Sequence, residues 1–305
     1  QGNFVNHKED TIAAGFVQAT YTGVENLKIV AGLRISKSKL RSTENEIMPK
    51  VSVLYNISNR WHTKYVYSTG FIHAPLVYND GADGWVYNPQ NMKFTQGTKL
   101  PQEVQTNEIQ VGYNSNKLQA SMTVFHIEMK NQFVWIGRTV PTAPAYLYTY
   151  INTESVKSIG LEADFKYFYD NSLSLYGNFT YQDSYYDSPY IVNSGGLRDA
   201  IYNVGDEIPN VPNTMYNLGI NYNFMKDSML NIHYRGYNGL YINQVHYKLQ
   251  SFVDINYRYN NIFMKGLDFS FYGKNIFDNT ELNDRDVFSS TEAGSNFGFS
   301  LEYTF

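Results

Sequence analysis

The chain ends with the segment Asn296-Phe297-Gly298-Phe299-Ser300-Leu301-Glu302-Tyr303-Thr304-Phe305. Its large apolar side chains fall on every second residue, and small or polar residues stand between them. Because successive side chains of a β-strand point to opposite faces, this spacing predicts a strand with one apolar and one polar face. The predicted strand ends on an aromatic residue.

The same period of two recurs upstream. Residues 159–166, 253–258 and 267–272 each alternate between apolar and polar side chains. Each predicted strand is about as long as a tilted strand that crosses a bilayer. Over the whole chain, the pattern predicts about 13 strands, near residues 10–20, 26–37, 47–58, 60–71, 103–114, 117–130, 155–168, 171–185, 211–224, 226–238, 248–260, 264–275 and 294–305.

The connections between these strands alternate between short and long. The short ones contain turn-forming residues, at Ser58-Asn59, Asn114-Ser115-Asn116, Asp170-Asn171, Lys226-Asp227 and Asn260-Asn261. The long ones lie near residues 38–46, 72–102, 131–154, 186–210, 239–247 and 276–293. Bacterial outer-membrane barrels have this asymmetry, with tight periplasmic turns and longer outer loops. The sequence therefore predicts an all-β fold, a transmembrane antiparallel β-barrel in the bacterial outer membrane with a periplasmic C-terminus.

The composition excludes several other classes of protein. The 305 residues are 43% hydrophobic, 17% charged and 16% aromatic, a mixture that excludes a disordered chain. No stretch approaches the roughly 20 apolar residues of a membrane-spanning helix. The absence of cysteine excludes a disulfide scaffold and a thiol nucleophile. A formal net charge of -4 gives no sign of the basic surface that nucleic-acid binding requires.

The number of predicted strands has a further consequence. Bacterial single-chain barrels have an even number of strands, so an odd number does not close in the usual way. An open sheet would leave backbone groups unpaired in lipid, at a cost of several kcal/mol for each group. We therefore expect the missing strands to come from more chain or from another chain.

Five segments carry short motifs in a fixed order along the chain. They are Ile47–Tyr55 followed by Tyr67–Pro75, Leu100–Glu103 with Asn107–Tyr113, Asn152 with Ser158–Ala163, Gly273–Asp278, and Leu301–Phe305. Together they resemble the C-terminal part of TonB-dependent outer-membrane receptors of the siderophore-receptor type. One position departs from that family, since His73 stands where arginine is common.

The resemblance covers essentially the whole chain and implies its architecture. Residues 1–305 would form about 13 C-terminal strands of a 22-stranded plugged barrel. The plug domain and the TonB box of the family have no counterpart in this sequence, so we expect them outside it.

The function implied by the resemblance is active transport without chemistry on the substrate and without a cofactor. Extracellular loops would capture a scarce ligand of the ferric siderophore, haem or cobalamin class, and energy from TonB would drive its import. Implied partners are the TonB complex acting through the plug, the barrel assembly machinery, membrane lipid, and a surface lipoprotein or another outer-membrane subunit. Two alternatives stay open: a glycan or peptide importer with a lipoprotein lid, and a barrel fragment that acts as an interaction scaffold.

Candidate ligand contacts are aromatic and polar residues of the long connections, because rings stack on aromatic or sugar groups and arginine pairs with carboxylates. They are Trp85, Tyr87, Trp135, Arg138, Tyr146, Tyr148, Tyr186, Tyr190, Arg198, Tyr241, His246 and Arg285. The structural alternative for each aromatic residue is a place in the girdle at a membrane interface. In a haem importer, His246 would be the best-placed axial ligand.

Metal binding and catalysis find little support in the sequence. Asn79–Gly84 is similar to a calcium loop, but Asn91 stands where the bidentate glutamate should follow. Arg285 partly neutralises the acidic residues beside it in Asn283–Asp286, and the six histidines show no tight ligand spacing. No Gly-x-Ser-x-Gly or His-Glu-x-x-His motif occurs. We therefore predict neither a metal site nor an enzyme.

Two further sets of residues follow from the strand pattern. The C-terminal strand resembles the family's signal for outer-membrane assembly, with the apolar residues Phe297, Phe299, Leu301, Tyr303 and Phe305. Charges of both signs fall on the polar faces of several strands, where they would suit contacts with a plug. They are Glu162, Asp164, Lys166, Asp254, Arg258, Asp268 and Lys274.

Overall fold

The computed structural model describes most of the chain. The described residues are 9–39, 44–75, 85–88, 93–96, 99–139, 146–152, 155–187, 190–193, 199–209, 211–242, 245–247, 249–279 and 294–304. In these ranges there is no helix that is long and apolar enough to cross a membrane.

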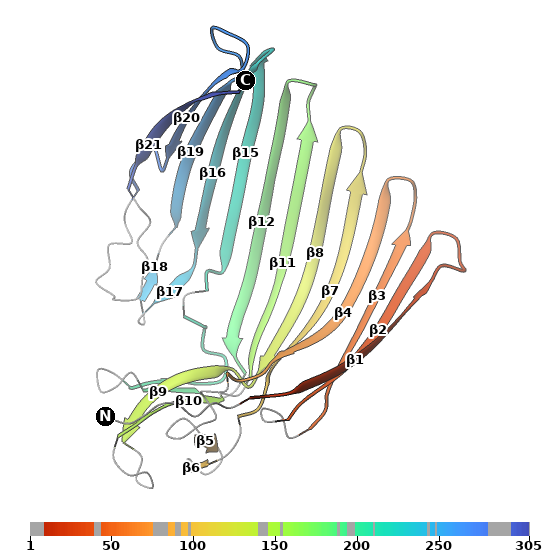
Figure 1. The fold of residues 1–305 in the computed structure, drawn as a ribbon, viewed down its shortest axis with the longest axis vertical. Coiled ribbons are helices and arrows are strands. Elements are labelled where there is room, and N and C mark those ends of the chain that lie inside the picture. The colour runs from red at the N-terminus through yellow and green to blue at the C-terminus, as the bar shows by residue number, and fades with distance from the viewer. Residues whose placement is uncertain are drawn as a thin grey trace.

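Thirteen strands form one antiparallel sheet, in which each strand pairs with the neighbours before and after it in the sheet (Figure 1). They are β1 (Ile12–Tyr21), β2 (Leu27–Ser38), β3 (Glu46–Asn56), β4 (Trp61–Ile72), β7 (Gln102–Asn114), β8 (Leu118–Lys130), β11 (Val156–Phe168), β12 (Leu173–Tyr186), β15 (Thr214–Met225), β16 (Ser228–Asn238), β19 (Gln250–Tyr259), β20 (Leu267–Lys274) and β21 (Asn296–Tyr303). The number and the positions of these strands confirm the prediction from period-two alternation.

Four small hairpins lie within the long connections, where no strand was predicted. They are β5 (Trp85–Asn88) with β6 (Lys93–Gln96), β9 (Phe133–Thr139) with β10 (Tyr146–Asn152), β13 (Tyr190–Asn193) with β14 (Asp199–Tyr202), and β17 (Leu240–Ile242) with β18 (Val245–Tyr247). We call the end of the sheet that carries these hairpins the hairpin end, and the opposite end the turn end (Figure 1).

Short turns join the strands at the turn end, and their polar side chains explain why the chain reverses there. In the connection from β11 to β12, one carboxylate oxygen of Asp170 accepts hydrogen bonds from the amides of Ser172 and Leu173, at 2.7 and 2.8 Å. The Ser172 hydroxyl also donates to it, at 2.7 Å. These bonds, led by that of the hydroxyl, hold the pKa of Asp170 below its usual range.

Two predicted strands, near residues 211–224 and 264–275, begin three residues before β15 and β20, and the second shows the physical reason. Residues 264–266 were assigned to a strand, whereas β20 begins at Leu267. Asn261, Phe263 and Gly266 have positive φ angles of 55°, 65° and 85°. Such backbone cannot continue a strand, so these residues form a longer turn. The apolar side chains of the turn had suggested a strand.

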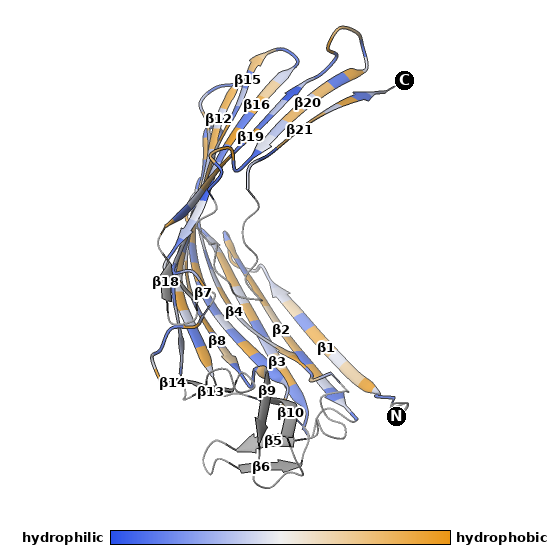
Figure 2. Cartoon of the chain, turned by 90° about the vertical axis from the view of Figure 1, so that its left-hand side faces the viewer, coloured by the Kyte–Doolittle hydropathy of each residue, from blue (hydrophilic) through white to orange (hydrophobic). Residues whose placement is uncertain are grey.

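The register separates the side chains of the sheet into an apolar face and a polar face. On β15, Leu218, Ile220 and Tyr222 share one face with apolar residues of β12 and β16, and Asn217 and Asn221 lie on the other. The sheet curves like an open half-cylinder (Figure 2). Because barrels of this kind turn apolar residues to lipid and polar residues to the lumen, we call the apolar face outer and the polar face inner.

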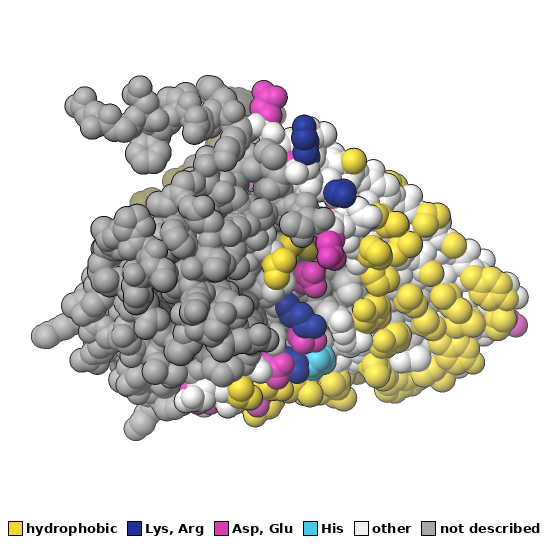
Figure 3. Space-filling model, turned by 90° about the horizontal axis from the view of Figure 1, so that it is seen from below, with side chains coloured by type: hydrophobic (Ala, Val, Ile, Leu, Met, Phe, Trp, Pro, Cys, Tyr) yellow, Lys and Arg dark blue, Asp and Glu magenta, His cyan; other side chains and the backbone are white. Residues whose placement is uncertain are grey.

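The outer face is apolar over most of its area and has charged residues near the hairpin end. Figure 3 shows this end, where Lys, Arg, Asp and Glu side chains gather along the edge of a broad hydrophobic surface. On β8, Lys130 lies 3.5 Å from Glu128, and Lys157 of β11 lies 2.7 Å from Asp187. The hydrogen bond from Lys157 lowers the pKa of Asp187. These pairs mark where the apolar surface ends.

Few apolar side chains of the described residues are buried, because within the described part of the chain no second layer packs on the sheet. Among the described residues, the buried apolar side chains include those of Phe125 and Phe252, whereas outer-face residues such as Ile109 and Phe299 are 57% and 75% exposed. An exposed apolar surface of this extent is explained by lipid as the solvent of the outer face.

Several glycines lie under aromatic rings on the neighbouring strand. A Cβ atom at Gly160 would clash with Phe125, one at Gly219 with Tyr176, and one at Gly298 with the Tyr272 ring. Covering a strand glycine with an aromatic ring offsets part of its poor strand propensity. These three glycines therefore allow an aromatic ring of the neighbouring strand to lie directly over the backbone.

The sheet is open at its two outermost strands. β1 and β21 are the ends of the strand order, and each pairs with one neighbour among the described residues. Their free edges carry backbone donors and acceptors that a membrane cannot satisfy. A closed barrel therefore requires additional strands between β21 and β1.

We predict that Gly219→Ala destabilises the full-length protein by about 1 to 3 kcal/mol, because its methyl group would overlap the Tyr176 ring. Urea unfolding of protein refolded in lipid would measure the change. Gly32→Ala is the matched control, since its added Cβ atom would meet only Val17 and Gln18, at the ordinary contact distances of 3.7 and 4.0 Å. Equal losses for both variants would contradict the packing described here.

We also predict that Ile220→Lys costs about 2 to 4 kcal/mol, because it places a charge on the lipid side of β15. Asn221→Lys changes the next residue, on the inner face, and should cost about 1 kcal/mol, the value of one hydrogen bond. The same unfolding assay compares them. A larger loss for Asn221→Lys would show that the two faces are reversed.

Candidate functional site

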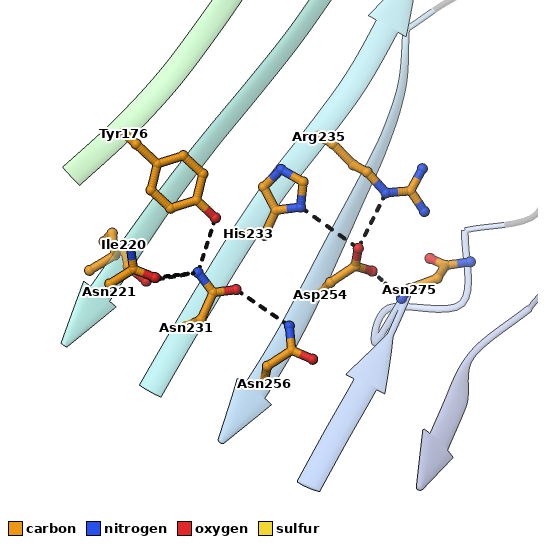
Figure 4. A network of polar contacts seen from close by, with 9 residues as sticks. All are labelled: Tyr176, Ile220, Asn221, Asn231, His233, Arg235, Asp254, Asn256 and Asn275. Atoms are coloured by element: carbon orange, nitrogen blue, oxygen red, sulfur yellow. Dashed lines mark hydrogen bonds and ion pairs between the residues drawn. The ribbon is translucent and has the colours of Figure 1, made fainter. Parts of the chain in front are cut away.

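A row of polar side chains crosses the inner face from β12 to β19 (Figure 4). The Asn231 amide nitrogen donates to the Tyr176 hydroxyl at 3.0 Å and to the Asn221 side-chain oxygen at 2.9 Å. Asn256 donates in turn to the Asn231 side-chain oxygen at 3.3 Å. Period-two alternation on four neighbouring strands brings these residues into one row.

A charged group lies beside this row, nearer the hairpin end. The Asp254 carboxylate accepts a hydrogen bond from Arg235 Nε at 3.3 Å and one from the backbone amide of Asn275 at 2.8 Å. His233 Nδ1 lies 3.9 Å from Asp254, within ion-pair range when the imidazole is protonated. The Arg235 guanidinium also stacks 4.6 Å above the Phe252 ring. Asp254 of β19 therefore links β16 to the turn that follows β20.

The turn after β20 is itself a hydrogen-bonded unit. The buried Asn275 has a positive φ of 47°, and its side chain donates to the carbonyl of Asn279 at 3.0 Å. The backbone amide of Asn279 donates to the side-chain oxygen of Asn275 at 3.0 Å. The Asn279 side chain donates to the carbonyl of Ser251 at 2.9 Å. The motif Gly273–Asp278 thus stops β20 and fixes the direction of the chain beyond it.

A second ion pair lies close to the turn end. Arg258 of β19 donates to Asp268 of β20 at 2.8 Å, and its Nε donates to Asn260 at 2.7 Å. Asp268 also accepts the backbone amide of Asn261 at 3.0 Å. Of the charges predicted for the inner face, Asp254, Arg258 and Asp268 are therefore paired.

The inner wall has the character of a binding surface. Its hydrogen bonds join amides, hydroxyls and paired charges, which can recognise a polar partner. In the described part of the chain, no group of three or more His, Cys, Asp and Glu residues could hold a metal ion. The absence of a metal site and of a cofactor stays a prediction.

Most of the predicted ligand residues lie in the small hairpins of the hairpin end. Trp85 and Tyr87 belong to β5, Tyr190 to β13, Tyr241 to β17 and His246 to β18. Tyr241 and His246 are partners in the β17–β18 ladder. Trp135 and Arg138 lie in β9, and Tyr146 and Tyr148 lie in β10.

Backbone contacts bring three of these hairpins together. β10 lies beside β5, and β9 lies beside β13. Asn152, at the end of β10, helps to hold this arrangement. Its side chain donates to the carbonyls of Leu100 and Asn131, at 2.9 and 2.7 Å, and accepts the Leu100 amide at 2.8 Å. Asn152, the asparagine of the motif, therefore links the connection between β8 and β11 to the connection that precedes β7.

The remaining predicted residues are placed differently. Tyr186 is the last residue of β12 and is buried, with its backbone paired to Asp206 and Gly205. Arg198, Arg285 and Phe305 lie outside the described residues. Of the predicted assembly signal, Phe297, Phe299, Leu301 and Tyr303 lie on the outer face of β21, paired with β20.

Asn221, Asn231 and Asn256 belong to the row of polar side chains on the inner face, which we call the amide row. Residue types alone did not single out this row. Asn221, Asn231 and Asn256 are ordinary polar residues of alternating strands, and only the register shows that they are neighbours. The signal that could have found them is their position on the same polar face as Asp254.

The family model described as TonB dependent receptor-like, beta-barrel matches residues 1–276 of the sequence. This match covers most of the chain, which therefore belongs to the family of TonB-dependent receptor-like β-barrels. Members of this family are outer-membrane barrels, and the family is one of transporters rather than enzymes. No curated protein sequence matches the chain.

Several solved structures share the fold. The siderophore receptor PirA from Acinetobacter baumannii is 18% identical, with a TM-score of 0.73, over 97% of this chain and 46% of PirA. A mutant of the ferric enterobactin receptor PfeA from Pseudomonas aeruginosa, in complex with enterobactin, is 15% identical, with a TM-score of 0.73 and the same coverage. The ferric yersiniabactin uptake receptor FyuA from Yersinia pestis is 14% identical, with a TM-score of 0.69, over 97% of this chain and 46% of FyuA. This chain thus spans less than half the length of each of these receptors.

We predict that Asp254→Ala loosens the turn after β20, because the Asn275 amide loses its acceptor and Arg235 loses its counter-ion. Hydrogen exchange at Asn275 and Ile276 should accelerate about tenfold, the effect expected from loss of one such bond. Asn256→Ala is the control and should leave exchange in this turn unchanged. An unaltered turn in Asp254→Ala would contradict the linkage.

Proposed function

We propose that this chain is the C-terminal part of the barrel of an outer-membrane receptor that captures a ferric siderophore and imports it with energy from TonB. The observation that carries the proposal is the family match over residues 1–276. The structural likeness to PirA, PfeA and FyuA, each described as a siderophore or ferric-siderophore receptor, favours this ligand class over haem or cobalamin.

In this proposal the hairpin end faces the outside of the cell, and the turn end, with the C-terminus, faces the periplasm. Long outer loops and short periplasmic turns are the rule in bacterial barrels. The predicted ligand residues then lie where an external ligand arrives. Hairpins that contact each other through β10, β5, β9 and β13 would present their aromatic residues as one surface.

The barrel would be completed by a further part of the receptor. Strands between β21 and β1 would close the sheet, and a plug inside the barrel would respond to TonB. The inner row of amides and paired charges would contact the plug, because these side chains face the lumen. The apolar residues of β21, from Phe297 to Tyr303, would be read by the barrel assembly machinery.

Uptake of radioactive iron by whole cells tests the proposal. Cells that make the full-length receptor should take up ferric enterobactin or ferric yersiniabactin, whereas cells that lack either the receptor or TonB should not. Trp135→Ala combined with Tyr148→Ala should lower uptake at least about tenfold, as expected for loss of aromatic anchors at a binding surface.

Tyr181→Ala is the matched control, because Tyr181 lies on the outer face of β12 and is 51% exposed. It should leave uptake unchanged when the same amount of receptor reaches the membrane. Uptake that is independent of TonB, or that takes place without the receptor, would overturn the proposal.

A further inference from the structure

A hollow of about 370 Å³ lies on the outer face of the sheet, beside the turn that joins β11 to β12. The apolar residues that line it belong to this turn and to β12, β15 and β16, which lie in the interior of the strand order. They are Tyr169, Leu173, Ile220, Tyr222, Leu230 and Ile232. The hollow therefore lies away from the free edges of β1 and β21.

The floor of the hollow is aliphatic. The register places Leu173 and Leu230 on either side of Tyr222 in one row. Ile220 lies opposite Ile232 in the next row toward the hairpin end. Branched aliphatic side chains gain from contact with hydrocarbon and cannot satisfy a polar group. The floor therefore suits an acyl chain.

Tyrosine residues also line the hollow. The ring centroid of Tyr222 lies 5.8 Å from that of Phe224, and Phe224 stacks on Tyr257 at 6.0 Å. Tyr169, in the turn, is 61% exposed. Tyrosine combines an apolar ring with a hydroxyl that can donate to a phosphate oxygen. These residues therefore suit the level at which the acyl chains of a lipid meet its head group.

The hollow has a carboxylate on its turn side, where Asp170 and Ser172 complete the lining. Three hydrogen bonds reach Oδ1 of Asp170, from the Ser172 hydroxyl and from the amides of Ser172 and Leu173. They hold the pKa of Asp170 below its usual range, so the carboxylate is anionic at neutral pH. Its second oxygen, Oδ2, can accept a hydrogen bond from a cationic group.

The neighbouring turn, between β15 and β16, adds charges of both signs. Ser172 also lines a second hollow, whose lining includes Lys226 and Asp227. Two carboxylates and one ammonium group thus lie around the end of the aliphatic floor. A head group with a phosphate and a primary ammonium is complementary to this set, because each of its charges finds the opposite one. A head group that carries only negative charge is not.

We propose that the hollow binds one phospholipid of the leaflet at the turn end, with an acyl chain on the aliphatic floor and a primary-ammonium head group at Asp170. The inference goes beyond the proposed function and uses from it only the assignment of the turn end to the periplasmic side. Strands that complete the barrel would join at β1 and β21, and a plug would lie in the lumen. The outer face at the hollow therefore stays turned to lipid.

Binding of lipid to the full-length receptor tests the proposal. The receptor is extracted from native membranes in a mild detergent and titrated with phosphatidylethanolamine or phosphatidylglycerol of identical chains, and native mass spectrometry counts the bound molecules. The first phosphatidylethanolamine should bind about fivefold more tightly than phosphatidylglycerol, the upper end of the range for one exposed ion pair. Equal affinity, or a preference for phosphatidylglycerol, would overturn the proposal.

Asp170→Asn tests the head-group contact without dismantling the turn. The asparagine side-chain oxygen can accept the same backbone amides, so the turn is kept while the charge is lost. The preference for phosphatidylethanolamine should disappear. Glu25→Gln is the matched control, because it removes a negative charge from the turn between β1 and β2, and it should leave the preference intact. A preference that survives in Asp170→Asn would contradict the assigned contact.

Ile220→Trp tests the aliphatic floor. The larger side chain would fill the hollow and should lower the affinity for both phospholipids at least about tenfold, because several methylene groups lose their contact. Ile109→Trp is the control, since it makes the same change at an outer-face residue of β7 that is 57% exposed and outside the hollow. Equal affinities of the two tryptophan variants would overturn the proposal. The charge variants still decide the matter if Ile220→Trp fails to reach the membrane.

The molecules that stay bound through purification distinguish the other occupants. One phosphatidylethanolamine should remain with each unmodified receptor and be lost from Ile220→Trp. A lipid A molecule in its place would show that the turn end faces the outer leaflet, and a protein chain in its place would show an interface between polypeptides. Either result would overturn the proposal.

Discussion

The fold depends on one requirement, that each backbone amide and carbonyl in hydrocarbon has a hydrogen-bond partner. Paired strands meet this requirement with hydrogen bonds between segments, whereas a helix meets it with hydrogen bonds within one segment. Each strand of the sheet is bonded to the strands beside it, from β1 to β21. Because the side chains of a paired strand alternate between two faces, every second residue meets lipid and the residues between them face the lumen. The apolar residues that would form a core in a soluble protein instead cover the outer face.

The inner face carries side chains that form hydrogen bonds and ion pairs. In the described part of the chain, amides and paired charges line β12 to β20. The small hairpins add aromatic residues at one end. Some aromatic side chains of this face lie directly over a glycine of the neighbouring strand, as Tyr176 does over Gly219. Polar contacts and contact with lipid thus fall on alternate residues of the same strands.

The strands and their faces could be predicted from the sequence because alternation is a local property of each segment. The turn of Asp170 could also be predicted, because its side chain bonds to its own neighbours. The four hairpins could not be predicted in this way. Asn152 at the end of β10, for example, is held by hydrogen bonds to Asn131 and to Leu100, which belongs to a connection far away in sequence. The start of β20 was misjudged because the apolar Met264 suits a strand by type, whereas the positive φ angles of Asn261, Phe263 and Gly266 reveal a turn. The amide row depends on register across several strands, which no single segment contains.

The most direct test of this account measures which solvent each residue of β15 meets. Single spin labels at residues 217, 218, 220, 221 and 222 of the full-length protein in lipid bilayers would report collisions with oxygen, which partitions into lipid, and with a water-soluble nickel complex. Gly219 is left unlabelled, because a side chain there would overlap the Tyr176 ring. A strict period of two is expected, with oxygen favoured at Leu218, Ile220 and Tyr222 and nickel contact greater at Asn217 and Asn221. A profile without this period, or with its phase reversed, would contradict the assignment of outer and inner faces on which the membrane barrel rests.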